Sequence, residues 1–209
     1  ELPPTSLNTL AVALQENLLN ELRNARLSFN EAAVKRFATP RRLALLIPDL
    51  ATGQADTSIE KLGPAVAAAF DADGKPTKAA EGFARGLGVN VSDLSRANTD
   101  KGERLSFQLV ERGLPAKSLL PKLILNALNA LPIAKRMRWG SSRAEFVRPV
   151  HWIVLLLNGE VVDCDLMGVS ASNISYGHRF HAPQPLTIDH PQNYASLLAD
   201  KGEVIADFD

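Results

Sequence analysis

The sequence has one cysteine, few aromatic residues and no net charge. Cys164 has no second cysteine to pair with, so an internal disulfide is excluded and a reducing, cytoplasmic location is expected. Lysine and arginine number 23, and aspartate and glutamate also number 23. This balance excludes a positive field over the whole surface that would attract nucleic acid. Any contact with RNA must therefore come from a local patch.

Long hydrophobic runs are also missing. The longest, at 152–157, has the length of a strand and is far shorter than the roughly 20 residues of a membrane helix. No signal peptide is recognisable either, and we expect no membrane partner. The 209 residues, 45% of them hydrophobic, can form one large domain or two small ones. Because the chain begins without methionine and stops within a strand-like pattern at 204–209, we interpret it as a fragment.

The hydrophobic pattern predicts interleaved helices and strands. Helices are expected at about 6–25 (with Ser6 as N-cap), 77–86, 118–131 (with Pro121 in the first turn) and 193–201, and strands at 33–37, 43–47, 59–62 and 105–109. Asn158-Gly159 predicts a hairpin between 151–157 and 160–167. The fold class is therefore α+β, with a mixed, largely antiparallel sheet and packed helices. We expect one domain, or two lobes that divide near residues 90–100.

The most informative segment is a basic stretch at 134–151. Its basic residues surround a single acid, Glu145, and alternate with the aromatic residues Trp139 and Phe146. The basic residues are Lys135, Arg136, Arg138, Arg143 and Arg148. Guanidinium groups bind phosphate in a bidentate manner, and flat rings stack on bases, so the combination favours RNA binding. Basic runs are nevertheless more often solvated faces, and a lone tryptophan more often packs in a core.

Two further basic clusters are present. Pro40 is expected to form a turn that presents Arg41 and Arg42 at its tip. The segment 177–180 adds His178 and Arg179. If the fold brings the clusters to one face, they predict phosphate contacts, with Trp139 and His178 as stacking partners. Alternatively, some of these bases neutralise buried carboxylates such as Glu145 or Glu103, or the segment contacts protein as a structural scaffold.

No residues form a recognisable catalytic or metal site. His178 and His181 lack the second ligand pair of a zinc site, and an extended chain would direct the two rings to opposite sides. Cys164 lies in an apolar strand, where a buried structural thiol is usual. The glycines at 82, 86 and 88 end a helix and lack a phosphate-binding lysine. We predict no catalytic residue, no metal ligand and no cofactor within this chain.

Several long segments resemble one known family in order along nearly the whole chain. They include TPRRLA at 39–44, FDADGKPTKAAEGFARG at 70–86, MRWG at 137–140, FVRPVH at 146–151 and GHRF at 177–180. On these segments the chain resembles the beta subunits of bacterial heterotetrameric glycyl-tRNA synthetases.

The resemblance implies the N-terminal region of a longer beta subunit, without its catalytic and anticodon-binding domains. It implies an assembly of two alpha and two beta subunits that joins glycine to tRNA(Gly), with ATP and magnesium used on the alpha subunit. It also implies a fold similar to the editing-type domain of phenylalanyl-tRNA synthetase beta chains. A vestigial hydrolase using His178 and His181 is a third, weaker hypothesis, because fold similarity does not carry function.

Overall fold

The computed structural model describes residues 2–141 and 143–207, which divide into two compact units. Residues 1–54 and 114–209 form the first unit, and residues 55–113 are inserted into it as the second. At the junction the Gln54 N–H donates to the Leu114 carbonyl (3.0 Å), and the Leu114 N–H donates to Gln54 Oε1 (3.1 Å). The expected dividing point at 90–100 lies inside the second unit, because strands at 57–65 and 102–111 pair with each other.

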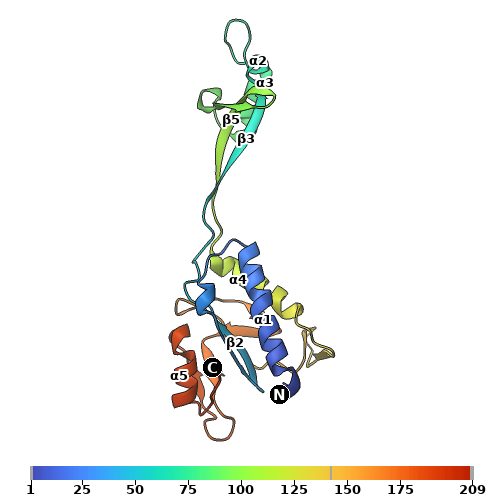
Figure 1. Ribbon diagram of the computed structural model, residues 1–209, viewed down its shortest axis with the longest axis vertical. Helices are drawn as coiled ribbons and strands as arrows, with labels where there is room; N and C mark the ends of the chain where they lie inside the picture. The colour runs from blue at the N-terminus through green and yellow to red at the C-terminus, as the bar shows by residue number, and fades with distance from the viewer. Residues whose placement is uncertain (1, 142, 208–209) are drawn as a thin grey trace. The chain divides into compact units, whose positions relative to one another are not determined.

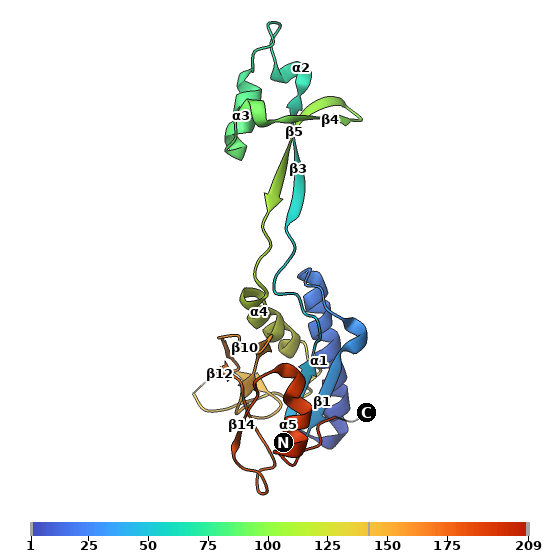
Figure 2. The same ribbon diagram turned by 90° about the vertical axis from the view of Figure 1, so that its left-hand side faces the viewer.

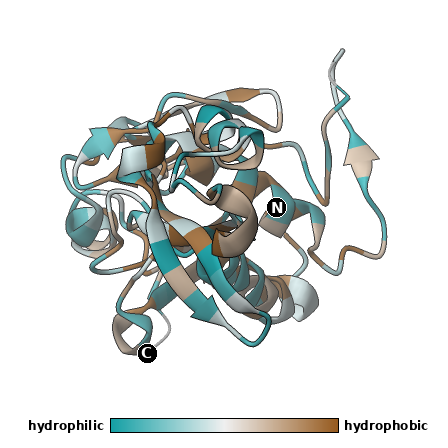
Figure 3. Ribbon diagram, turned by 90° about the horizontal axis from the view of Figure 1, so that it is seen from above, coloured by the Kyte–Doolittle hydropathy of each residue, from teal (hydrophilic) through white to brown (hydrophobic). Residues whose placement is uncertain are grey.

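Two long helices form the framework of the first unit. These are α1 (Pro4–Asn24) and α4 (Ala116–Asn129), which lie side by side (Figure 1). Asn17 Nδ2 donates to the Ala127 carbonyl (3.2 Å), and Asn126 Nδ2 donates to Glu21 Oε2 (2.8 Å). The predicted stripe of leucines on α1 is buried against this interface: Leu7, Leu10, Leu14, Leu18 and Leu22. Hydrophobic and hydrophilic residues are interleaved along the same elements, as amphipathic packing requires (Figure 3).

Two details of the predicted helix starts were wrong. The N-cap of α1 is Pro3 rather than Ser6, and the Ser6 hydroxyl donates back to the Pro3 carbonyl (3.1 Å) from within the first turn. Pro4 is the first residue of α1, a position that favours proline because its missing N–H would have no partner within the helix. Helix α4 begins at Ala116 and not at residue 118, so Pro121 lies inside α4 and beyond its first turn.

A β-hairpin packs between helices of the first unit. Strands β1 (Lys35–Thr39) and β2 (Arg42–Leu46) are antiparallel, with α1 against them. On the other side Phe37 packs with Leu198 of α5 (Tyr194–Asp200). The outer edge of β1 is covered where the Ala38 N–H donates to the Ala206 carbonyl (3.2 Å).

The rest of the first unit consists of short strands. They are β6 (Met137–Arg138), β7 (Glu145–Phe146), β8 (Ile153–Val154), β9 (Leu156–Leu157), β10 (Glu160–Val161), β11 (Asp165–Leu166), β12 (Val169–Ser172), β13 (Ile174–Tyr176) and β14 (Pro185–Thr187). β8 and β12 pair in parallel, and the other strand pairs are antiparallel. The predicted α+β class is confirmed, although the strands form several small sheets. The Asn158-Gly159 hairpin joins β9 and β10, with positive φ at both turn residues (52° and 84°).

The second unit is a three-stranded antiparallel sheet with two helices. The order is β3 (Thr57–Ala65), β5 (Gly102–Glu111) and β4 (Ser95–Thr99), and α2 (Val66–Ala69) and α3 (Lys78–Leu87) pack at one end of the β3–β5 pair (Figure 2). Ala69, Ala80 and Leu105 form its buried centre. α3 ends at Leu87 and is capped by Gly88 (φ 72°), close to the predicted end at residue 86.

Three short 3-10 helices complete the described secondary structure: Glu31–Ala33, Val91–Asp93 and Pro191–Asn193. The strand-like pattern at 204–209 forms no strand over 204–207, and residues 208–209 lie outside the described residues. Within the described ranges, no helix is both long and apolar enough to cross a bilayer.

Candidate nucleic-acid interface

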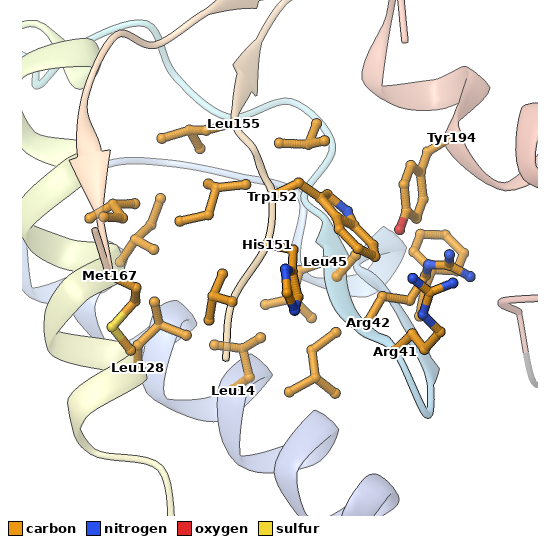
Figure 4. Close-up of a pocket in the computed structure, with 18 of the residues that line it drawn as sticks. Leu14, Arg41, Arg42, Leu45, Leu128, His151, Trp152, Leu155, Met167 and Tyr194 are labelled. Carbon is orange, nitrogen blue, oxygen red and sulfur yellow. The ribbon is translucent and has the colours of Figure 1, made fainter. Parts of the chain in front are cut away.

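The basic residues singled out in the sequence fall into two groups within the first unit. Four of them line one cavity of about 920 Å³: Arg41, Arg42, Arg148 and Arg179. Trp152 lines the same cavity (Figure 4). The second group, with Lys135, Arg136, Arg138 and Arg143, belongs to the segment around the β6–β7 hairpin, which also contains Trp139. The structure thus brings together residues from the turn at 39–42, the segment at 148–152 and the loop at 177–180.

Arg41 is held at the cavity by the turn between β1 and β2. The Thr39 hydroxyl accepts the Arg41 N–H (3.3 Å), which fixes the turn that Pro40 predicted. The Arg41 guanidinium carbon lies 5.6 Å from the centre of the Trp152 ring, and that of Arg42 lies 6.0 Å from it. Both distances are within the range of cation–π attraction. Arg41 remains half-exposed, so its charge is available at the surface.

Arg42 is buried and has a structural role. Its side chain donates from Nη2 to the Tyr176 carbonyl (2.8 Å), which ties β2 to β13. Its Nε is buried without a hydrogen-bond partner among the described residues. Burial lowers the pKa of Arg42, and neighbouring Arg41 lowers it further, while Tyr194 opposes the shift. An arginine with 7% of its surface exposed is poorly accessible to a large anionic ligand.

Aromatic residues complete this cluster. The Trp152 and Tyr176 rings meet edge to face with their centres 5.3 Å apart, and Tyr194 packs 5.5 Å from Phe37. Burial raises the pKa of the Tyr194 hydroxyl, and the nearby Arg42 charge and the Ser175 hydroxyl oppose that shift. Tyr194 is therefore neutral at physiological pH. Its hydroxyl points toward the two arginines in Figure 4.

The loop at 177–180 corrects one expectation about the histidines. His178 Nδ1 accepts the N–H groups of Phe180 (3.3 Å) and His181 (3.2 Å), which turns the chain. The rings of His178 and His181 therefore lie 4.5 Å apart, whereas an extended chain would have separated them. The Arg179 guanidinium stands 4.9 Å from the Phe180 ring, and Phe180 is 74% exposed.

The basic segment at 134–148 is partly neutralised within the protein. Arg138 and Glu145 are opposite each other in the β6–β7 pair, and their side chains form an exposed ion pair of 3.2 Å. Arg136 Nη2 donates to the carbonyls of Asn129 (2.8 Å) and Leu131 (3.4 Å) at the end of α4. Free carbonyls at a helix end favour such a cation. Arg138 thus has an acidic partner and Arg136 bonds to main-chain carbonyls, but Glu145 is exposed and not the buried carboxylate that the alternative supposed.

The remaining members of the segment differ in exposure. Trp139 is half-buried and packs against the main core, which is the ordinary role of a lone tryptophan. Lys135 and Arg143 are exposed. Glu103, the other acid considered, forms an exposed pair of 3.6 Å with Arg96 in the second unit.

In the described ranges, no three His, Cys, Asp or Glu side chains are grouped closely enough to hold a metal ion. Burial raises the pKa of the Cys164 thiol, and Asp165 and Asp163 raise it further. A raised pKa lowers the thiolate fraction, so Cys164 lacks the activation of a nucleophile.

Trp152, Tyr176 and Phe180 were not among the predicted site residues. Trp152 belongs to an apolar run whose pattern predicts a core strand. Its position next to the basic segment is the one signal in the sequence that could have indicated a role at the site. The pairing of its ring with Arg41 depends on contacts between segments far apart in the sequence.

Comparison with known proteins identifies the family. All 209 residues match the family model described as glycyl-tRNA synthetase beta subunit. The glycine–tRNA ligase beta subunits of Hahella chejuensis, Actinobacillus pleuropneumoniae serotype 7 and Edwardsiella ictaluri are 49%, 51% and 48% identical to the chain over 209, 208 and 209 residues. Each match covers 100% of this chain and 30% of the relative, so the chain spans about 30% of the length of these curated relatives. With its full length matched by the family model, the chain belongs to the glycyl-tRNA synthetase beta subunit family.

Proposed function

We propose that this chain supports tRNA(Gly) binding and subunit assembly in a cytoplasmic glycine–tRNA ligase. In this proposal the ligase uses ATP to attach glycine to tRNA(Gly), and the chemistry, with ATP and magnesium, takes place on an alpha subunit. The family match and the relatives' names support the ligase assignment. The observation that carries the RNA-binding role is the gathering of Arg41, Arg148 and Arg179 beside Trp152 at one cavity.

The cluster has the chemistry for phosphate contacts. Arg148 and Arg179 are exposed residues, Arg41 is half-exposed, and all three line the same cavity. The exposed ring of Phe180 lies beside Arg179 and offers a surface on which a base can stack. Phosphate contacts supply affinity and register but little sequence information, so tRNA identity would be read elsewhere in the ligase.

The segment at 134–148 contributes less to this proposal than its composition suggested. Arg136 and Arg138 are engaged with the α4 end and with Glu145, so the candidates that remain there are the exposed Lys135 and Arg143. Trp139 packs in the core, and His178 uses Nδ1 to hold its own turn. Phosphate contacts by Lys135 or Arg143 would add to those of the cavity cluster, which consists of Arg41, Arg148 and Arg179.

The test uses the complete alpha–beta ligase with Arg41, Arg148 and Arg179 all changed to glutamine. Binding of tRNA(Gly) is measured over a range of salt concentrations. Loss of three phosphate contacts should weaken binding at low salt and flatten the plot of log affinity against log salt by about 2. A triple change to lysine keeps the charges and should keep most of that slope.

A charge-matched control tests whether the effect is local. Changing the exposed Lys75, Lys101 and Arg112 of the second unit to glutamine removes the same three charges. This control should leave the salt dependence near that of the parent ligase. Equal weakening by both triple variants, or no change in either, would reject the cavity cluster as the RNA-binding surface.

The internal use of Arg136 and Arg138 favours a second function, that of a scaffold for the alpha subunit or for later beta domains. Exposed hydrophobic residues in the second unit, Leu62 (47%) and Val110 (59%), are consistent with a protein partner. Native mass spectrometry of the alpha subunit with full-length beta variants separates the two functions. Loss of assembly with tRNA affinity retained by the assembled fraction would favour the scaffold.

A further inference from the structure

A cation and two aromatic rings from three separate segments of the first unit lie in contact. The guanidinium carbon of Arg41 lies 5.6 Å from the centre of the Trp152 ring (Figure 4). The Trp152 ring in turn meets the Tyr176 ring edge to face, with 5.3 Å between their centres. Tyr176 is the last residue of β13 and is 37% exposed. The turn at 39–42, the segment at 148–152 and the end of β13 are therefore joined at this point.

More rings lie in the loop that directly follows β13. His178 is two residues beyond Tyr176, so their α-carbons are at most about 7 Å apart. The His178 ring centre lies 6.1 Å from that of Phe180 and 4.5 Å from that of His181. The Arg179 guanidinium carbon lies 4.9 Å from the centre of the Phe180 ring, which is 74% exposed. We call the following residues the ring–cation strip: Arg41, Trp152, Tyr176, Arg179 and Phe180.

Hydrogen bonds within the protein hold the loop of the strip in place. The Gly202 carbonyl accepts the His178 N–H (2.7 Å), and the His178 carbonyl accepts the Ala182 N–H (2.9 Å). Arg42 fixes the end of the preceding strand by donating to the Tyr176 carbonyl (2.8 Å). Because a loop that is already fixed has little conformational freedom to lose on binding, its rings are preorganised for a flat ligand.

The segments that form the strip contain no acidic residue. Residues 35–48, 146–157 and 174–188 together carry six lysines and arginines and no aspartate or glutamate, although the whole chain has equal numbers of both signs. The local excess of positive charge favours an anionic ligand. A protein partner would have to be strongly acidic to match these segments, whereas every nucleotide carries a negative phosphate.

The exposed ring of Phe180 distinguishes between paired and unpaired nucleotides. In a duplex each base is stacked on its neighbours, so it has no free face for a protein ring. An unpaired base can turn outward and stack on an aromatic side chain or on a guanidinium plane. A duplex stem would use the charge of Arg179 but would leave the Phe180 ring exposed to water.

We propose that the ring–cation strip binds unpaired nucleotides of tRNA, with the rings of Phe180 and Tyr176 stacking on bases. This inference rests on the proposed function, because Arg41 and Arg179 contact the phosphates that join those bases. It adds the kind of RNA structure that the site selects. Unpaired nucleotides occur at the 3′ end of a tRNA and in its loops, and both present a free base face beside phosphates.

The first test measures binding of tRNA(Gly) by the complete alpha–beta ligase with Phe180→Ala. Loss of one stacked base should weaken binding about 5- to 150-fold. Because no charge is removed, the slope of log affinity against log salt should equal that of the parent. Phe180→Trp keeps a ring and should keep binding. Phe70→Ala in the second unit is the matched control and should bind like the parent, since Phe70 also has an arginine beside its ring, Arg96 at 5.8 Å.

The stacking and the phosphate contacts can fail separately. A flatter salt plot for the triple glutamine variant, combined with parent-like binding by Phe180→Ala, would keep the phosphate contacts and overturn the stacking. Weaker binding by Phe180→Ala with an unchanged salt plot for the triple variant would support stacking and reject the arginine cluster. Parent-like behaviour of both variants would overturn both.

Photo-crosslinking identifies the nucleotides that stack on the strip. A benzophenone amino acid at position 180 of the complete ligase should crosslink to tRNA(Gly), and nuclease digestion with mass spectrometry locates the crosslinked nucleotide. A crosslink at the unpaired 3′ end or in a loop supports the proposal and distinguishes the two sources. The same probe in place of Val110 of the second unit, which is 59% exposed, should give no such product. Crosslinks from position 180 only to paired stems, or only to protein, would contradict the proposal.

Discussion

Gly177 and Gly202 approach so closely that no side chain fits between them. A β-carbon on Gly177 would lie 2.5 Å from the Gly202 carbonyl oxygen and 2.7 Å from its α-carbon. The same carbonyl accepts the His178 N–H at 2.7 Å. This contact fixes the loop that carries Arg179 to the chain segment directly after α5. The position of one cluster arginine thus depends on two residues without side chains.

Replacing Gly177 by alanine should destabilise the first unit by about 1–3 kcal/mol, because backbone atoms would have to move apart. Both tryptophans of the chain, Trp139 and Trp152, belong to this unit, so urea unfolding followed by tryptophan fluorescence reports on it. Gly86→Ala, where a β-carbon meets no atom within 4 Å, lies in the second unit and should leave this fluorescence midpoint unchanged. Equal unfolding midpoints for Gly177→Ala and the parent would contradict the close contact.

Arg136 and Arg138 should differ in their contribution to stability. Arg136→Ala removes donors from carbonyls at the end of α4 and should cost about 1 kcal/mol. Arg138→Ala removes an exposed ion pair with Glu145 and should cost less than about 0.5 kcal/mol. Fluorescence-detected unfolding of the two variants at the same salt concentration makes the comparison. A larger loss for Arg138→Ala would mean that the β6–β7 ion pair is more important than its exposure suggests.

Tyr194 should make the first unit less stable at alkaline pH. Burial raises its pKa above the ordinary value of about 10, so the folded state holds the phenolic proton more tightly than the unfolded chain. The resulting stability is complete below about pH 10 and declines as pH rises through the folded pKa. Tyr194→Phe should remove this decline, which unfolding midpoints between about pH 9 and about pH 11 would reveal. Parallel pH profiles for the parent and the variant would reject a raised pKa.

Arg42 should be more sensitive to substitution than Arg41, its neighbour in the turn. Arg42→Gln breaks the bond to the Tyr176 carbonyl and should cost about 2 kcal/mol. Arg41→Gln changes a half-exposed side chain and should stay within about 0.5 kcal/mol of the parent. Thermal unfolding of the first unit, followed by circular dichroism, is the measurement. Similar midpoints for the two variants would show that Arg42 is not a structural residue.

Locally encoded features were predictable from the sequence. The leucine stripe of α1 follows helical spacing, the end of α3 needs a residue with positive φ at Gly88, and Asn158-Gly159 satisfies the backbone of a tight hairpin. The insertion was not predictable, because its limits depend on pairing between 57–65 and 102–111. Periodicity within each segment carries no information about that partner.

In the candidate site too, locally encoded features were predictable and contacts between distant segments were not. Arg41 and Arg42 were recognised from composition and from the turn at Pro40, but burial of Arg42 depends on a carbonyl from β13. The ion pair between Arg138 and Glu145 depends on a hairpin of two-residue strands, too short to leave a pattern. His178 caps backbone N–H groups, so its loop turns where the sequence suggested an extended chain.

The junction at Gln54 and Leu114 has a consequence for how this protein can be altered. Since the chain leaves the first unit and returns to it at two hydrogen-bonded neighbours, the 59 intervening residues (113 − 54) can be excised and the gap bridged by a short turn. A gene without residues 55–113 would yield the first unit alone, in which the arginine cluster can be studied in the absence of the second unit.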